Sequence, residues 1–141
     1  MERTKADFKA LRETVGISQQ ALADALGVDK RSVQRWEAYG NSWRPPADAW
    51  DVLDAARVRQ QWTVKNALEI ANDPKNLHMP VNLTYWRSQE DYERAGHGGD
   101  YQAANANARM IAARLEDDGR VVSFGFGGLR EAGAGVDFGG M

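Results

Sequence analysis

A short stretch in the first third of the chain carries the residue types that read DNA bases. Residues 30–37 (KRSVQRWE), taken as a helix at about 100° per residue, place four basic or amide side chains on one arc of about 140°. Val33 and Trp36 lie on the opposite side. Arginine and lysine donate to guanine, and glutamine pairs with adenine. Side chains near the start of such a helix reach deepest into the major groove, so the pattern predicts these base contacts: Lys30, Arg31 and Gln34, with Ser32 as a helper at the edge of the arc.

Other polar residues flank this helix and are suited to the sugar-phosphate backbone. Arg35 lies at the far edge of this arc, beyond the three expected base contacts. Ser18 and Gln19 could hold a phosphate at the start of a preceding helix, and capping without DNA contact explains them equally well. The turn after residue 37 supplies three more expected backbone contacts: Asn41, Trp43 and Arg44. For Trp43, packing beneath the next helix is the alternative.

These side chains require a scaffold of three short helices in residues 1–40. Apolar residues recur at helical spacing in the first, Ser18 can cap a second over residues 19–26, and Asp29 can cap the third. A helix-turn-helix needs a small residue at the helix crossing, a glycine-like turn and a branched apolar residue on its second helix. Glu37 is expected to be structural, bonded to a helix end or to Arg12. The expected helix-turn-helix core is Leu22, Ala23, Leu26, Gly27, Val33 and Trp36.

The stretch LRETVGISQQALADALGVDKRSVQRWE resembles the Cro/C1-type, or XRE-like, helix-turn-helix family of phage and bacterial repressors. Its Leu-Arg, Ser-Gln, Leu-Ala, Leu-Gly-Val and Trp-Glu elements occur together at the spacing of that family, over roughly residues 5–57. The resemblance implies an all-α domain, sequence-specific binding of double-stranded DNA and usually dimers. The sequence departs from the family after residue 37, where Ala38-Tyr39-Gly40 replaces a shorter Glu-Asn-Gly-type turn.

The rest of the chain predicts a different architecture. Residues 46–72 have the pattern of one long helix whose apolar stripe drifts, so we expect its two halves to pack on different partners. Strands are expected over 81–86 and 120–126, with helices over 88–95 and 101–118 between them. The fold class is therefore mainly α with a small α+β C-terminal part: an N-terminal helix-turn-helix bundle, a long linking helix, then strand-helix-helix-strand.

This organisation predicts three segments. Residues 1–60 are the helix-turn-helix domain, residues 61–126 an α+β dimerisation domain that shares the long helix, and residues 127–141 a Gly-rich flexible tail. The element order of the second segment resembles regulators encoded beside anti-CRISPR genes. That resemblance implies a dimeric autorepressor of a phage or mobile-element operon. The expected dimer interface is Leu83, Tyr85, Ile111, Leu115, Val122 and Phe124.

Composition argues against several other functions. The net charge of −2 provides no global basic field, so any DNA-binding surface must be local. No apolar run is long enough for a membrane span, and the charged N-terminal stretch does not have the pattern of a signal peptide. The absence of cysteine excludes disulfides and thiol catalysis. We expect no cofactor, no metal and no enzymatic activity, and a cytoplasmic, nucleoid-associated protein of bacterial or phage origin.

Three alternatives to a regulator follow from the same residues. An antitoxin would use the same DNA-binding head with a tail that binds a toxin. An enzyme carrying such a head is disfavoured because His78 and His97 are isolated and the carboxylates form no evident catalytic pair. A purely structural three-helix bundle would have no need for an acid-free basic face. The leading hypothesis expects double-stranded DNA with an inverted repeat, and a second copy of the chain, as partners.

Overall fold

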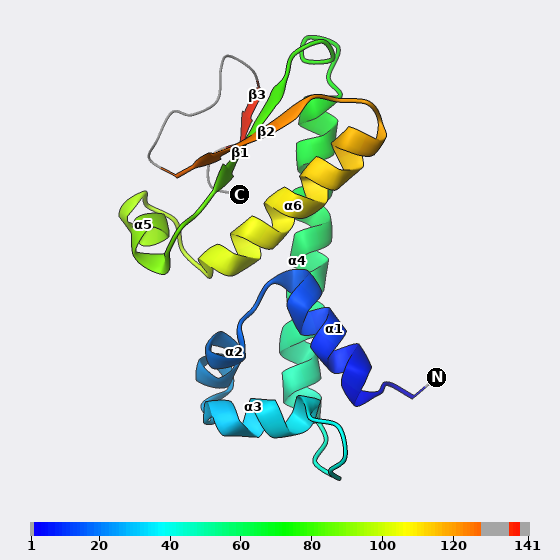
Figure 1. The fold of residues 1–141 in the computed structure, drawn as a ribbon, viewed down its shortest axis with the longest axis vertical. Helices are drawn as coiled ribbons and strands as arrows, with labels where there is room; N and C mark the ends of the chain where they lie inside the picture. Colours follow the sequence, from blue (N-terminus) through cyan, green and yellow to red (C-terminus); the bar gives the residue numbers. More distant parts are fainter. Residues whose placement is uncertain (1, 128–135, 139–141) are drawn as a thin grey trace. The chain divides into compact units, whose positions relative to one another are not determined.

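The computed structural model describes residues 2–127 and 136–138. Contacts divide the chain into two compact units, Met1–Arg59 and Gln60–Met141, which we call unit 1 and unit 2. The chain is mainly helical, with a long helix followed by a small region of strands and helices, so the predicted fold class is confirmed (Figure 1). Among the helices of the described residues, none has the length and apolar character that crossing a membrane requires.

Unit 1 is built from short capped helices. Helix α1 (Lys5–Val15) begins after a capping box at Thr4, α2 (Gln19–Leu26) after Ser18, and α3 (Lys30–Glu37) after Asp29. Both α1 and α2 end at a glycine with positive φ, which removes the steric cost of the turn that follows. Local sequence thus dictates where each of these helices starts and stops.

A single apolar cluster holds unit 1 together. Phe8 is fully buried at its centre, with edge-to-face contacts to the rings of Trp36 at 6.2 Å and Trp50 at 5.0 Å. The expected helix-turn-helix core residues take these places: Leu22, Ala23, Val33 and Trp36 are buried, Leu26 packs against the cluster, and Gly27 lies exposed at the turn with φ 67°.

The long helix α4 (Ala47–Ala71) contributes to the cores of both units. Its first half supplies Ala49, Leu53 and Ala56 to the unit 1 cluster, and its second half supplies Val64, Ala67 and Ala71 to unit 2. This confirms the prediction that the two halves pack on different partners. Trp62, an apolar residue of the same helix, is 59% exposed and belongs to neither cluster.

Unit 2 contains a three-stranded parallel sheet of order β2-β1-β3 (Figure 1). Its elements are β1 (Val81–Tyr85), α5 (Gln89–Arg94), α6 (Tyr101–Asp117), β2 (Val122–Phe126) and β3 (Val136–Phe138). Strand β3 pairs with β1 from Val81↔Val136 to Leu83↔Phe138 and was not predicted, since only pairing with β1 identifies so short a strand in a Gly-rich sequence. The remainder of the expected flexible tail, residues 128–135 and 139–141, lies outside the described residues.

The core of unit 2 corrects half of the predicted dimer interface. Leu83, Ile111 and Leu115 are at most 2% exposed because they pack together between the sheet, α6 and the second half of α4 within one chain. They cannot meet a second copy on the surface. Tyr85 and Val122 are partly buried, and Phe124 is 41% exposed.

Two polar clamps fix the ends of the sheet in unit 2. The buried Asn105 amide accepts the Trp86 N–H at 2.8 Å and donates to the Trp86 carbonyl at 2.9 Å. Both main-chain groups of the residue that follows β1 are therefore satisfied. The Arg120 guanidinium donates to four oxygens that include the Ala71 and Met79 carbonyls. The end of α4 and the start of β2 are therefore joined.

Candidate nucleic-acid interface

Helix α3 presents its polar arc to solvent. Val33 is fully buried and Trp36 is 8% exposed, so the apolar side of α3 is fastened to the unit 1 core. The opposite arc carries no acid and consists of four exposed side chains: Lys30, Arg31, Gln34 and Arg35. Within the described part of the chain, no hydrogen bond or ion pair holds the side chains of Lys30, Arg31 or Gln34. Their donors are therefore available to a partner.

The N-terminal end of α3 is held by its cap. Both the Ser32 N–H and the Ser32 hydroxyl donate to the Asp29 carboxylate, at 2.9 and 3.1 Å. These bonds, with smaller contributions from the charges of Arg35 and Arg31, lower the pKa of Asp29 below its usual value of 3.8. Ser32, predicted as a helper in base contacts, is half-buried and bonded to this cap. The first turn of the helix is thus preorganised.

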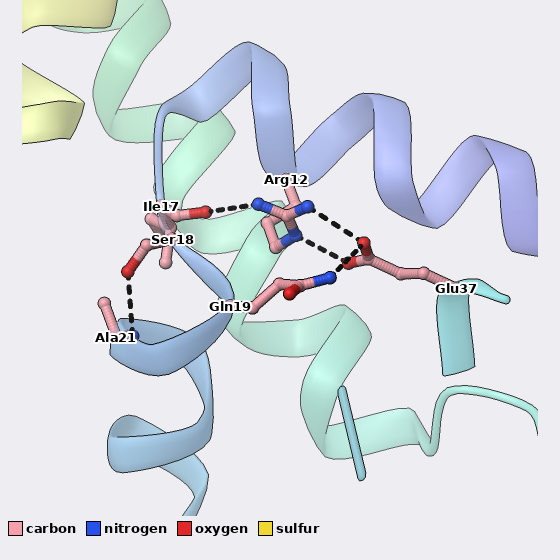
Figure 2. Close-up of polar contacts among 6 residues, drawn as sticks. All are labelled: Arg12, Ile17, Ser18, Gln19, Ala21 and Glu37. Carbon is pink, nitrogen blue, oxygen red and sulfur yellow. Dashed lines mark hydrogen bonds and ion pairs between the residues drawn. The ribbon is translucent and has the colours of Figure 1, made fainter. Parts of the chain in front are cut away.

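A buried ion pair joins the other end of α3 to α1 (Figure 2). The Arg12 guanidinium donates to both carboxylate oxygens of Glu37, and its remaining Nη1 donates to the Ile17 carbonyl at 3.0 Å. The Arg12 and Glu37 side chains are only 10% and 4% exposed. The hypothesis that Glu37 is structural is confirmed. This pair holds the last turn of α3 in place and keeps the acid away from the exposed arc.

Ser18 and Gln19 have intramolecular roles at the start of α2. Ser18 Oγ accepts the Ala21 N–H at 3.0 Å and so caps the helix, and Gln19 Nε2 donates to Glu37 at 3.2 Å (Figure 2). Both side chains are half-buried. These contacts match the capping alternative for Ser18, while a phosphate contact by either residue remains a prediction.

The turn after α3 forms an exposed loop of residues 38–44, which we call the α3–α4 loop. The Asn41 side chain accepts the Trp43 N–H at 2.9 Å. Trp43 is 56% exposed, so the alternative that it packs beneath the long helix is wrong. The Arg35 guanidinium lies over the Trp43 ring at 5.3 Å, a cation–π contact that restrains both side chains. Arg44, which follows Trp43 in the sequence, is exposed.

Lys5 is a loop-organising residue that the sequence pattern did not single out. Its ammonium donates to three oxygens of the α3–α4 loop and the end of α3. The partners lie 30 to 38 residues away in the chain. A lone lysine in the first turn of a helix gives no sequence signal for such contacts. Tyr39, at the tip of the loop, is also completely exposed and was not singled out.

Residues 8–41 match the model of the helix-turn-helix family. The match begins within α1, contains α2 and α3, and ends in the α3–α4 loop, so it supports the Cro/C1-type, XRE-like resemblance of the N-terminal residues. It does not extend to unit 2. A comparison with curated proteins found no match.

Proposed function

We propose that the chain is a sequence-specific, DNA-binding transcriptional regulator whose α3 enters the major groove. The observation that carries this proposal is the exposed, acid-free arc of α3 inside a segment that matches the helix-turn-helix family. The major groove admits one α-helix, and the apolar side of α3 is already committed to the unit 1 core. The polar arc is therefore the side that faces the base edges.

The proposed contacts divide by chemistry. Lys30, Arg31 and Gln34 read bases, because their exposed donors and amide match guanine and adenine edges near the helix start. Arg35, Trp43 and Arg44 contact the backbone from the far end of the helix and the α3–α4 loop, where contacts fix orientation without reading sequence. Ser18, which caps α2, and its neighbour Gln19 are proposed to make further phosphate contacts, as is Asn41 in the loop.

We also propose that the regulator is a homodimer that pairs through β2. In the described part of the sheet, β2 is an edge strand. The Val121 carbonyl accepts the Val81 N–H at 2.8 Å, and the Gly127 N–H donates to the Tyr85 carbonyl at 3.1 Å. In a parallel ladder, only every second residue of a strand bonds to the neighbouring strand. The main-chain groups of Val122, Phe124 and Phe126 therefore point away from β1.

The sequence of this edge is complementary to itself. An antiparallel pair with a two-fold axis at Phe124 places Phe124 opposite its copy and Val122 opposite Phe126, each as a hydrogen-bonded pair. Residues 121–127 (VVSFGFG) contain no charge and no proline, the devices that protect edge strands from pairing. Phe124 and Phe126 are 41% and 43% exposed, so pairing buries apolar surface as well. Of the predicted interface, Val122 and Phe124 fit this arrangement, while Tyr85 lies on the central strand β1 and contacts the Phe124 ring at 5.7 Å.

A dimer of this kind reads an inverted repeat. Half-sites are expected about 34–36 Å apart, or at a multiple of that spacing, so that two heads meet the same face of the duplex. The element order of unit 2, which resembles anti-CRISPR-associated regulators, supports a role as the autorepressor of a phage or mobile-element operon. Binding by the second head becomes effectively intramolecular, which raises the affinity of a modest basic surface.

The proposal is tested by selecting bound duplexes from a random pool with the full chain. Enrichment of a palindrome whose half-sites are one or two helical turns apart would support both the DNA-binding and the dimer proposals. Enrichment of a single half-site would support DNA binding and contradict the dimer. Failure to enrich any sequence both at low salt and at higher salt, where nonspecific binding is weaker, would contradict the function itself. Co-purification of a small protein that releases the DNA would instead favour the antitoxin.

A further inference from the structure

We propose that Lys5 is the positioning residue of the α3–α4 loop, which sets the geometry of the backbone contacts before DNA arrives. This inference rests on the proposed function and adds a residue outside the matched family segment of residues 8–41. Lys5 itself does not contact DNA. It holds the side chains that do.

The contacts of the Lys5 ammonium show why it positions rather than binds. Its Nζ donates to the Arg35 carbonyl at 2.9 Å, to Asn41 Oδ1 at 2.6 Å and to the Trp43 carbonyl at 2.6 Å. An ammonium group has three donors and no acceptor, so these oxygens use all of them. A phosphate oxygen would have to displace one of the three.

The same three bonds determine the shape of the loop. They tie the end of α3, at Arg35, to two positions in the loop, and Asn41 Oδ1 also accepts the Trp43 N–H at 2.9 Å. The Trp43 ring is thereby held where the Arg35 guanidinium lies over it at 5.3 Å. Lys5 thus acts on Arg35 through Trp43. Losing it would leave the loop and two long side chains to be ordered during binding, at an entropic cost.

The position of Lys5 in α1 indicates that a lysine there does not stabilise the helix itself. Lys5 is the first residue of α1, where the helix dipole disfavours positive charge. The other charged group of this first turn is Asp7, which completes the capping box with Thr4 and is suited to that position. A cation at Lys5 is explained by the three neutral oxygens, one at the end of α3 and two in the loop, to which it donates.

The test is a set of double-mutant cycles on operator DNA from the random-pool selection. Lys5→Met is expected to weaken binding about 3- to 10-fold, the range for losing the preorganisation of one or two side chains. In the Arg35→Ala background the same substitution should weaken binding by a smaller factor than in the wild type, because one of the side chains that Lys5 positions is gone. In the Arg31→Ala background it should keep its full effect, because Arg31 belongs to the base-reading arc and has no contact with the loop.

A matched control separates positioning from charge. Lys9 lies on the same helix, is exposed and loses the same charge in Lys9→Met, which should change binding less than 2-fold. Equal effects of the Lys5 and Lys9 variants, or equal effects of Lys5→Met in all backgrounds, would overturn the inference. If thermal melting shows that Lys5→Met unfolds unit 1, Asn41→Ala removes one of the three acceptors from the loop side. Because Asn41 is itself a proposed phosphate contact, the positioning role predicts that part of its effect, and not all of it, is lost in the Arg35→Ala background.

Failure of this inference is distinguishable from failure of the proposed function. If the wild type selects an operator and Arg31→Ala weakens it, the function stands whatever Lys5 does. A neutral Lys5→Met then overturns the positioning role alone. If the wild type selects no sequence, both are overturned.

Discussion

Arg12 and Glu37 are 25 residues apart in the sequence and form a buried, two-pronged ion pair between α1 and the last residue of α3. A carboxylate at the end of the proposed recognition helix would repel a phosphate if it were exposed. Its pairing with Arg12 neutralises it and, through the Ile17 carbonyl, also ties down the turn before α2. Orientation of the helix and removal of an unwanted charge therefore depend on the same contact.

Breaking this pair from one side should destabilise unit 1. Glu37→Ala leaves the Arg12 guanidinium buried without its partner, and the expected loss is about 3–5 kcal/mol of unfolding free energy. Denaturant unfolding followed by circular dichroism measures it. Glu13→Ala, which removes an exposed carboxylate from α1, is the control and should change stability by about 0.5 kcal/mol or less. A loss no larger than that of the control would show that the pair contributes little.

Two arginines should affect DNA binding in different ways. Arg31→Ala is expected to cost about 1–3 kcal/mol on the selected operator and to relax the preference at one base position. Arg44→Ala should weaken all sequences to the same degree and reduce the salt dependence of binding by about one phosphate contact. Titrations of operator and scrambled duplexes at several salt concentrations measure both quantities. An Arg31→Ala variant that binds its operator like the wild type would rule out the assignment of α3 as the base reader.

The cap of α3 should make unit 1 sensitive to acid. The pKa of Asp29 is lowered in the fold, chiefly by the Ser32 N–H, so its carboxylate stabilises the folded state above the unfolded pKa near 3.8. That stabilisation is lost as the pH falls through the lower folded pKa. Asp29→Asn keeps a capping side chain without the titrating charge. The wild type should melt at a higher temperature than this variant at pH 6, and the difference should shrink below about pH 4. A difference independent of pH would contradict this reading of the cap.

The proposed pairing of β2 places Phe124 next to its own copy. Residues that face each other as a hydrogen-bonded antiparallel pair have Cα atoms about 5.5 Å apart, which a disulfide can span. Because the chain contains no cysteine, a single Phe124→Cys substitution can form only an intermolecular disulfide. Mild oxidation should convert this variant to a covalent dimer, seen by nonreducing electrophoresis.

Val121→Cys is the matched control for this register. Val121 is 70% exposed and lies just before the same strand, so it is more accessible than Phe124. In the proposed register, however, its two copies lie about 20 Å apart along the strands, too far for a disulfide. Rapid cross-linking of Val121→Cys with none of Phe124→Cys would show that the two chains meet in another way, and a monomeric mass for the wild type would exclude the dimer.

Local sequence was sufficient for the helix-turn-helix. Caps at Ser18 and Asp29 and the glycines that end α1 and α2 act within a few residues, so they can be recognised without a structure. Helical geometry alone likewise places Val33 and Trp36 on one face of α3 and the basic residues on the opposite face. The strands β1 and β2 were predicted for the same reason, because their side chains alternate over a short distance.

Contacts between distant segments decided the rest. Leu83 and Leu115 have the same apolar character as a surface residue of a dimer, and only the packing of α6 on the sheet shows that they are internal. Strand β3 exists because β1 offers it a partner, and Lys5 acquires its role from oxygens more than two dozen residues away. In each case the stabilising free energy comes from contacts between groups that are distant in the sequence and come together only in the folded chain. The spacing of residues within one segment cannot predict such contacts.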